Sequence, residues 1–162
     1  MSKINNSKQR ILHIIPSLQQ GGAERVLTNF IEETPDTEHH VVLLLDRDIF
    51  FIPKFGKLYR PSRLGLLTIP VALWRIRQLT KKYHFDAVHS WLYYGNLVSI
   101  AVKGKDLPII WSIHNTDLSK TLSNFKLHFA NWACACLSSW VPAKIVYCGQ
   151  KARTLHENVG YS

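Results

Sequence analysis

Residues 11–33, ILHIIPSLQQGGAERVLTNFIEE, decide the fold of this chain. Ile11 to Ile15 form a short apolar run that ends at Pro16, and a turn-forming Gln-Gln-Gly-Gly sequence follows. Beyond the glycines, apolar residues recur at spacings of three and four, which is typical of an amphipathic helix. The stretch therefore predicts a strand, a glycine loop and a helix in succession.

The rest of the chain continues this alternation. Further strands are predicted at residues 41–45, 85–90, 109–114 and 144–148, with a short one at 50–52 or 57–59. Helices are predicted at residues 64–83, 93–103, 117–139 and 150–158, and Pro70 either delays or kinks the first of them. The pattern predicts an α/β fold: one Rossmann-like open parallel sheet, residues 1–162, with helices on both faces.

Composition agrees with one compact cytoplasmic domain. The chain has 162 residues, 46% apolar and 19% charged, which suits a folded domain and excludes a disordered one. The N-terminus lacks the pattern of a signal peptide, and no apolar stretch is long enough to span a membrane. Cys134, Cys136 and Cys148 have neither disulfide nor metal spacing, so we expect buried, reduced thiols.

The net charge of +9 is concentrated in one basic segment. No acidic residue occurs between Asp48 and Asp86, whereas eight basic residues lie there among aromatic ones. An anionic membrane surface or a lipid phosphate would attract such a segment. A solvated helix face with a basic loop is the simpler interpretation and is slightly favoured, and nucleic acid is the least favoured partner. The residues that we predict to contact membrane or phosphate are Lys54, Lys57, Arg60 and Arg63.

Ligands of open parallel sheets bind beyond the carboxyl ends of the strands, which marks out three places in this chain. The first is the Gly21-Gly22 loop, where a helix N-terminus with free amides favours an anion such as a phosphate. A tight turn without a ligand is the alternative. Neither the GxGxxG dinucleotide motif nor a P-loop is present, and clustered metal ligands and hydrolase motifs are also absent from the sequence.

The other two places carry histidines. His114 and Asn115 close the fifth predicted strand, and His89 ends the fourth. An imidazole there can donate a hydrogen bond to a sugar hydroxyl or exchange a proton with it. A packed or capping role is the competing interpretation for both histidines.

Four stretches together resemble the N-terminal domain of group 4 glycosyltransferases, retaining enzymes of the GT-B fold. They are ILHIIPSLQQGGAERVLTNF (11–30), FDAVHSWLYYGNLVSI (85–100), PIIWSIHNT (108–116) and KIVYCGQKARTLHENVG (144–160). By this resemblance Gly21, Gly22 and Glu24 line the cleft near the donor diphosphate and the acceptor, and His114 faces the donor sugar as the catalytic candidate. Cys148 departs from the serine that the family often has there.

The resemblance also implies what partners to expect. A nucleotide-sugar donor, held by a C-terminal domain that we expect to be absent from this chain, would give its sugar to a glycan or lipid-linked acceptor in cell-surface polysaccharide synthesis. We expect no other cofactor, little or no transfer by the chain alone, and a cytoplasmic location, either free or peripheral on the inner membrane face. The alternative is a non-catalytic module that binds a glycan or lipid phosphate or docks with a separate donor domain. A small NAD-dependent Rossmann enzyme is disfavoured by the missing motif.

Overall fold

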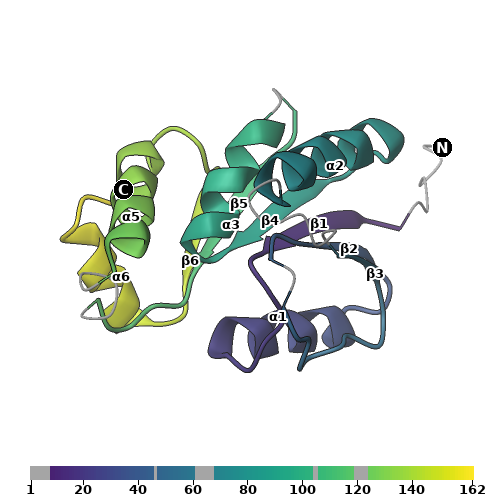
Figure 1. Cartoon of the computed structure of the whole chain (residues 1–162), viewed down its shortest axis with the longest axis horizontal. Helices are drawn as coiled ribbons and strands as arrows, with labels where there is room; N and C mark the ends of the chain where they lie inside the picture. Colours follow the sequence, from purple (N-terminus) through teal and green to yellow (C-terminus); the bar gives the residue numbers. More distant parts are fainter. Residues whose placement is uncertain (1–7, 46, 61–67, 104–105, 119–123) are drawn as a thin grey trace, which may run out of the picture.

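The computed structural model of the chain describes residues 8–45, 47–60, 68–103, 106–118 and 124–162. Within them lies a six-stranded sheet of order β3-β2-β1-β4-β5-β6, and every neighbouring pair of strands is parallel (Figure 1). The strands are β1 (Arg10–Ile15), β2 (Glu38–Leu43), β3 (Lys57–Tyr59), β4 (Ala87–Trp91), β5 (Ile109–Ile113) and β6 (Lys144–Tyr147). The helices are α1 (Gly22–Glu33), α2 (Thr68–Lys82), α3 (Leu92–Ser99) with a 3-10 turn at Ile100–Val102, α5 (Phe125–Leu137) and α6 (Gln150–Glu157).

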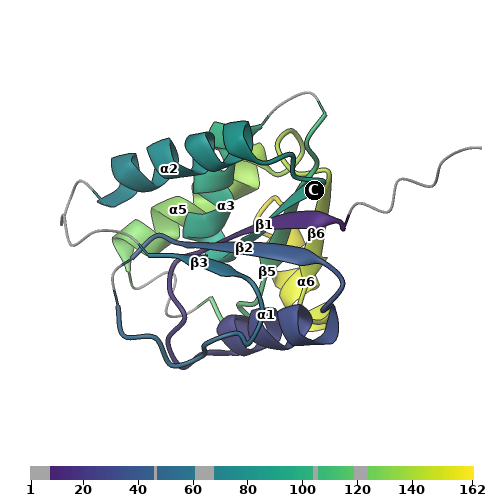
Figure 2. The same ribbon diagram turned by 90° about the vertical axis from the view of Figure 1, so that its right-hand side faces the viewer.

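Helices cover both faces of the sheet, as the sequence predicts. Figure 2 shows α1 below the strands and α2 and α3 above them. Ile15 faces α1, where it packs in one core with Leu27. Leu12 and Ile14 point the other way, into a second core with Ile76 of α2. Because successive strand residues alternate between faces, β1 needs apolar residues on both sides, which explains why all of residues 11–15 except His13 are apolar.

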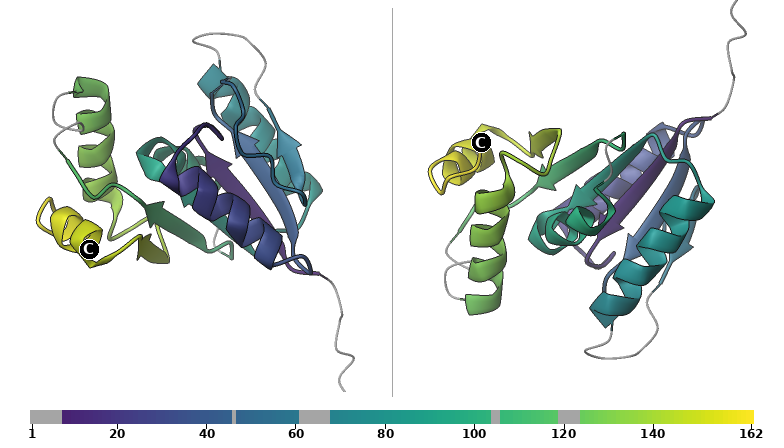
Figure 3. Two further views of the ribbon diagram at one scale, coloured as in Figure 1. Left: turned by 90° about the horizontal axis from the view of Figure 1, so that it is seen from below. Right: turned by 90° about the horizontal axis from the view of Figure 1, so that it is seen from above.

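The fourth to sixth strands lie on one side of β1, and the second and third lie on the other. The chain therefore adds β2 and β3 on one side of β1 and then crosses over to add β4, β5 and β6 on the other side. Such a switch point leaves a crevice at the carboxyl ends of β1 and β4. At the far end of the sheet, α5 and α6 stand beyond β6 (Figure 3). This order of strands positions the candidate site described below.

The strand bounds depart from the prediction at β2. It begins at Glu38, three residues before the apolar run, because polar side chains there find partners inside the fold. The Glu38 carboxylate accepts hydrogen bonds from Arg10 Nε and Lys57 Nζ, both at 2.6 Å. These cations, together with His40, lower the pKa of Glu38 to about 2. A search for apolar runs does not detect such a strand.

The short third strand is β3 at residues 57–59, which confirms one of the two predicted positions. The other position, residues 50–52, is not a strand. Instead, the backbone amides of Phe50 and Phe51 donate to the carbonyl oxygen of Leu18 at 2.7 and 3.1 Å. That segment therefore lies against the loop after β1.

Two helices are shorter than predicted. The first, α2, begins at Thr68, with Pro70 in its first turn, where the missing N–H costs nothing. Residues 64–67 of the predicted helix lie outside the described residues. The second, α5, begins at Phe125, because the Asn124 side chain accepts hydrogen bonds from the backbone amides of Lys126 and Leu127 and caps the helix. Residues 115–118 are not helical, and residues 119–123 lie outside the described ranges.

All three thiols are free, but their predicted burial is correct only for Cys134. Cys136 and Cys148 are exposed, because one lies on the outer face of α5 and the other follows the edge strand β6. Burial raises the pKa of Cys134 to about 12, so its thiol stays protonated. In the described part of the chain, no helix has both the length and the apolar character needed to cross a membrane.

A close approach between α3 and the sheet gives a first prediction. Gly95 faces the backbone of β1, and a β-carbon there would lie 2.6 Å from the carbonyl oxygen of Ile14. Glycine to alanine usually stabilises a helix by about 1 kcal/mol. Gly95→Ala should instead lower the free energy of unfolding by about 1–3 kcal/mol, because backbone atoms would have to move.

Gly22→Ala is the matched control, since a β-carbon at Gly22 meets no atom within 4 Å. Urea denaturation of both variants measures the difference. A Gly95→Ala protein as stable as wild type would show that α3 is not held against β1 as described.

Candidate functional site at the carboxyl edge

The carboxyl ends of three neighbouring strands bring the candidate groups to one edge of the sheet. The strands β1, β4 and β5 are adjacent and parallel, with Ile14 beside Ser90 and Trp91 beside Ser112. The glycine loop after β1, the end of β4 and His114 after β5 therefore lie along the same edge, which we call the carboxyl rim. The expected placement of the double glycine and His114 on one edge is thus confirmed.

The glycine loop leads into the N-terminus of α1, and the carboxylate of Glu24 already lies there. Gly21 precedes α1, and Glu24 occupies the third position of the helix. The Glu24 carboxyl group lies against the Cα atom of Gly21, where a β-carbon would collide with it. Partial burial raises the pKa of Glu24, while a hydrogen bond from its own backbone amide opposes that rise. Open space remains beside Gly22, so a ligand can approach the backbone there.

Trp91 forms the floor of the rim, although the sequence analysis did not single it out. Its side chain is buried at the end of β4, in one cluster with Ile15, Leu18 and Ala23. The next residue, Leu92, has a φ of 62°, a conformation that costs a non-glycine residue about 1 kcal/mol or more. Backbone strain of this kind concentrates at functional sites. The chain thus turns from β4 into α3 at a single strained residue.

His114 lies on this floor. Its imidazole ring stacks on the Trp91 indole, with ring centroids 5.4 Å apart and an angle of 25° between the planes. The side chain is partly exposed, and so is that of Asn115. Burial lowers the pKa of His114 below its usual value of 6.5. At pH 7 the ring is therefore neutral, with one nitrogen that donates a hydrogen bond and one that accepts.

His89 does not end β4, contrary to the prediction. The strand continues to Trp91, because Ser90 and Trp91 both pair with β5. The His89 ring lies 4.3 Å from the Trp91 ring, and its Nε2 atom is 2.7 Å from Ser112 Oγ. Burial and the nearby charge of His114 lower the pKa of His89 to about 4. His89 therefore supports the rim from within the sheet.

A directed chain of hydrogen bonds runs from Trp91 across the sheet. The Trp91 indole N–H donates to His13 Nδ1 at 3.4 Å, which leaves His13 Nε2 to donate to His39 Nδ1 at 3.0 Å. His39 Nε2 then donates to Thr34 Oγ1 at 3.0 Å, and Thr34 donates to the carbonyl oxygen of Phe30. Burial lowers the pKa of both histidines, so each ring is neutral. This chain fixes the indole under His114.

Sequence reasoning missed these inner histidines. A signal was present, since His13 interrupts the apolar run of β1 and His39 directly precedes that of β2. Polar residues next to such runs need partners, and two neighbouring strands can supply them to each other. Nothing in the sequence, however, specifies which histidine faces which.

The four basic residues do not form one patch. Lys54 and Lys57 lie near the amino end of β3, beside Glu38, and Lys57 pairs with that carboxylate. Arg60 follows β3 at the carboxyl side, where its carbonyl oxygen accepts a hydrogen bond from Arg75. Arg63 lies outside the described residues. Their assignment to a membrane or a phosphate stays a prediction.

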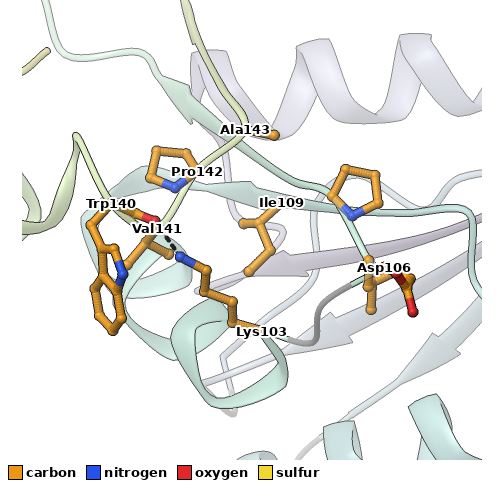
Figure 4. Close-up of a pocket in the computed structure, with 9 residues that line it drawn as sticks. Lys103, Asp106, Ile109, Trp140, Val141, Pro142 and Ala143 are labelled. Atoms are coloured by element: carbon orange, nitrogen blue, oxygen red, sulfur yellow. Dashed lines mark hydrogen bonds between the residues drawn. The ribbon is translucent and has the colours of Figure 1, made fainter.

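A shallow pocket of about 400 Å³ lies at the opposite, amino edge of the sheet (Figure 4). It precedes β5 and β6, and its lining includes Lys103, Asp106, Pro108, Trp140 and Pro142. It is therefore separate from the carboxyl rim. Among the residues that the structure describes, no group of three or more His, Cys, Asp or Glu side chains is arranged to hold a metal ion.

Comparisons agree with this geometry. The arrangement is that of a Rossmann-like half of a GT-B glycosyltransferase, and solved structures of such enzymes superpose on it. HepE from Anabaena in complex with UDP-glucose has a TM-score of 0.68 at 18% identity, covering 94% of this chain and 41% of HepE. The HepE complex with UDP and glucose gives a TM-score of 0.71 at 17% identity, covering 95% and 42%.

Sucrose-phosphate synthase from Thermosynechococcus elongatus has a TM-score of 0.56 at 13% identity, covering 86% of this chain and 47% of that enzyme. No curated protein sequence matches the chain. The model of Glycosyltransferase Family 4 matches residues 20–162, and the chain belongs to this family. It spans less than half the length of the solved structures named here.

The buried neutral histidines predict a dependence of stability on pH. A histidine whose pKa is lowered by folding binds its proton more readily in the unfolded state. The stability that these neutral histidines contribute is therefore fully present above pH 6.5. It is lost as the pH falls from 6.5 towards the pKa of about 4 at His89. Each such proton contributes up to about 1.4 kcal/mol per pH unit in this window.

His89→Gln should reduce the slope of unfolding free energy against pH by the contribution of about one proton. His128→Gln, at an exposed position of α5, should leave the slope unchanged. Urea denaturation between pH 7.5 and pH 4.5 measures the slopes. Equal slopes for wild type and His89→Gln would contradict the neutral, buried state of this ring.

Proposed function

We propose that the chain is the acceptor-side domain of a retaining glycosyltransferase that moves a sugar from a nucleotide-sugar donor to a glycan or lipid-linked acceptor. The synthesis of cell-surface polysaccharide is the process that we assign to it. The observation that carries the proposal is the shared rim, where His114 on its indole floor lies at the same edge as the glycine loop. Membership of Glycosyltransferase Family 4 supports it.

Each rim group has a task that fits its environment. The neutral imidazole of His114 hydrogen-bonds a hydroxyl of the sugar being transferred, and the stacked indole holds it in orientation. Asn115 adds a neutral amide next to it. The open backbone at Gly22 approaches the donor diphosphate or the acceptor, and Glu24 accepts hydrogen bonds from hydroxyl groups. His89 acts indirectly, through contact with Trp91.

The donor requires a second domain. HepE, which has been solved with UDP-glucose, is more than twice as long as the part that this chain matches. Transfer needs donor and acceptor held together with water excluded, and one open rim does not enclose them. We therefore propose that this chain alone has little or no activity and acts together with a donor-binding domain.

The test combines truncation with a rim variant. Release of nucleoside diphosphate from a panel of nucleotide sugars is measured for this chain alone and for this chain joined to a donor-binding domain. Only the joined protein should turn over. In it, His114→Ala should lower kcat by about 10²–10³-fold, because an oriented polar contact to the reacting sugar is lost.

His84→Ala is the control, at an exposed position before β4 on the opposite edge of the sheet, and it should retain wild-type kcat. Equal turnover by the chain alone, or wild-type kcat in His114→Ala, would overturn the proposal. The anomeric configuration of the product, read by proton NMR, tests retention separately.

A non-catalytic docking module is the second candidate, and exposed apolar side chains favour it. Phe50 and Ile52, in the segment that contacts the loop after β1, are 63% and 70% exposed. Apolar side chains at this position suit a partner domain that covers the rim. Nucleotide-sugar turnover by the joined protein decides between the two candidates.

A further inference from the structure

Three large aromatic side chains follow one line along the outer surface of α5. Phe125, Phe129 and Trp132 are 81%, 54% and 54% exposed, and their spacing of four and three residues places them on one face of the helix. The rings of Phe129 and Trp132 lie 5.7 Å apart, in contact with each other. We call these three residues the α5 aromatic stripe.

The fold does not need this stripe. The opposite face of α5 packs on α3 through small or polar residues, and Asn131 there accepts a hydrogen bond from the Tyr161 hydroxyl at 2.9 Å. Ala130 and Cys134 complete that buried face. Because α5 is already anchored, exposed phenylalanine and tryptophan on its outer face indicate an interaction surface.

Aromatic exposure continues beyond the end of the helix. Trp140 is 65% exposed, and Figure 4 shows Lys103 reaching across to it. The Lys103 ammonium lies 4.4 Å from the centre of the Trp140 ring and donates to the carbonyl oxygen of the same residue. An ammonium beside an exposed indole combines an apolar side chain with a cation, the pairing that suits the headgroup region of a bilayer.

The segment of sequence that contains the stripe carries charge of one sign. The sequence has no acidic residue between Asp117 and Glu157. Three lysines of this stretch are exposed: Lys126, Lys144 and Lys151. This segment therefore attracts an anionic partner, and it contains no carboxylate that opposes the attraction.

From these observations we propose that the α5 aromatic stripe docks the domain on an anionic lipid bilayer. Phenylalanine and tryptophan side chains enter the boundary between headgroups and acyl chains, while the lysines contact lipid phosphates. The stripe belongs to α5, which stands at one end of the molecule (Figures 1 and 3), and a flat surface can approach a helix in that position.

The proposed surface differs from the basic segment of the sequence analysis. Lys54, Lys57 and Arg60 lie around β3, at one edge of the sheet, whereas α5 and α6 stand beyond β6, at the other edge. Lys57 is moreover paired with Glu38, which also pairs with Arg10. The proposal concerns only where the domain binds, so it stands independently of the transfer reaction.

Flotation with lipid vesicles tests the proposal on the whole chain. Wild type should bind vesicles of phosphatidylcholine with about one third phosphatidylglycerol and should bind pure phosphatidylcholine weakly. Phe129→Ser with Trp132→Ser should weaken binding about tenfold or more, because two apolar side chains no longer enter the bilayer. Trp74→Ser, at a 61% exposed tryptophan on α2, is the matched control and should bind as wild type.

Trp132→Phe gives a second measurement that does not risk the fold. It should keep binding but lose most of the blue shift in tryptophan emission that vesicles induce in the wild type. Wild-type binding by the double serine variant, or loss of binding in Lys54→Ser with Arg60→Ser alone, would overturn the proposal. So would size-exclusion chromatography showing that the stripe holds two copies together and that no vesicle composition binds the chain.

Discussion

The parallel pairing of β1 with β2 on one side and β4 on the other is the constraint on which the rest of the structure depends. It buries β1 on both faces, so that α1 and α3 must cover it from opposite sides. It also places His13 between His39 and His89, one strand away from each. The same pairing brings the glycine loop and the end of β4 to one edge.

The buried histidines behind Trp91 form their hydrogen bonds with other groups of the protein, and these bonds give the rim its rigidity. Each nitrogen of His13 has a partner, one from Trp91 and one from His39. A protonated His13 would turn its Nδ1 atom into a donor facing the indole N–H, so the network excludes a proton as well as water. The two hydrogen bonds of His13 therefore keep its buried ring neutral and also hold the Trp91 indole in place under His114.

Much of the fold could be predicted from the sequence, because apolar runs and helical spacing mark the central elements. The unpredicted parts are those where polar side chains replace apolar ones. The first residues of β2 are polar, with Glu38 in ion pairs to Arg10 and Lys57, and a pattern of apolar residues does not show such pairs. At the site, His114 and the glycine loop could be placed from strand ends. Trp91 could not, since its role arises from contacts with rings on β1, on β4 and just after β5.

Leu92 adds a last consequence. Its left-handed backbone would suit glycine better, yet its side chain packs beside the core that contains Trp91. Burial of a leucine side chain and relief of a strained φ have similar magnitudes, about 1–3 kcal/mol each. The leucine thus offsets its own strain through packing and holds the turn in one conformation. The Leu92 side chain therefore keeps the turn from β4 into α3 rigid. A substitution there should change the conformation of the turn more than the free energy of unfolding.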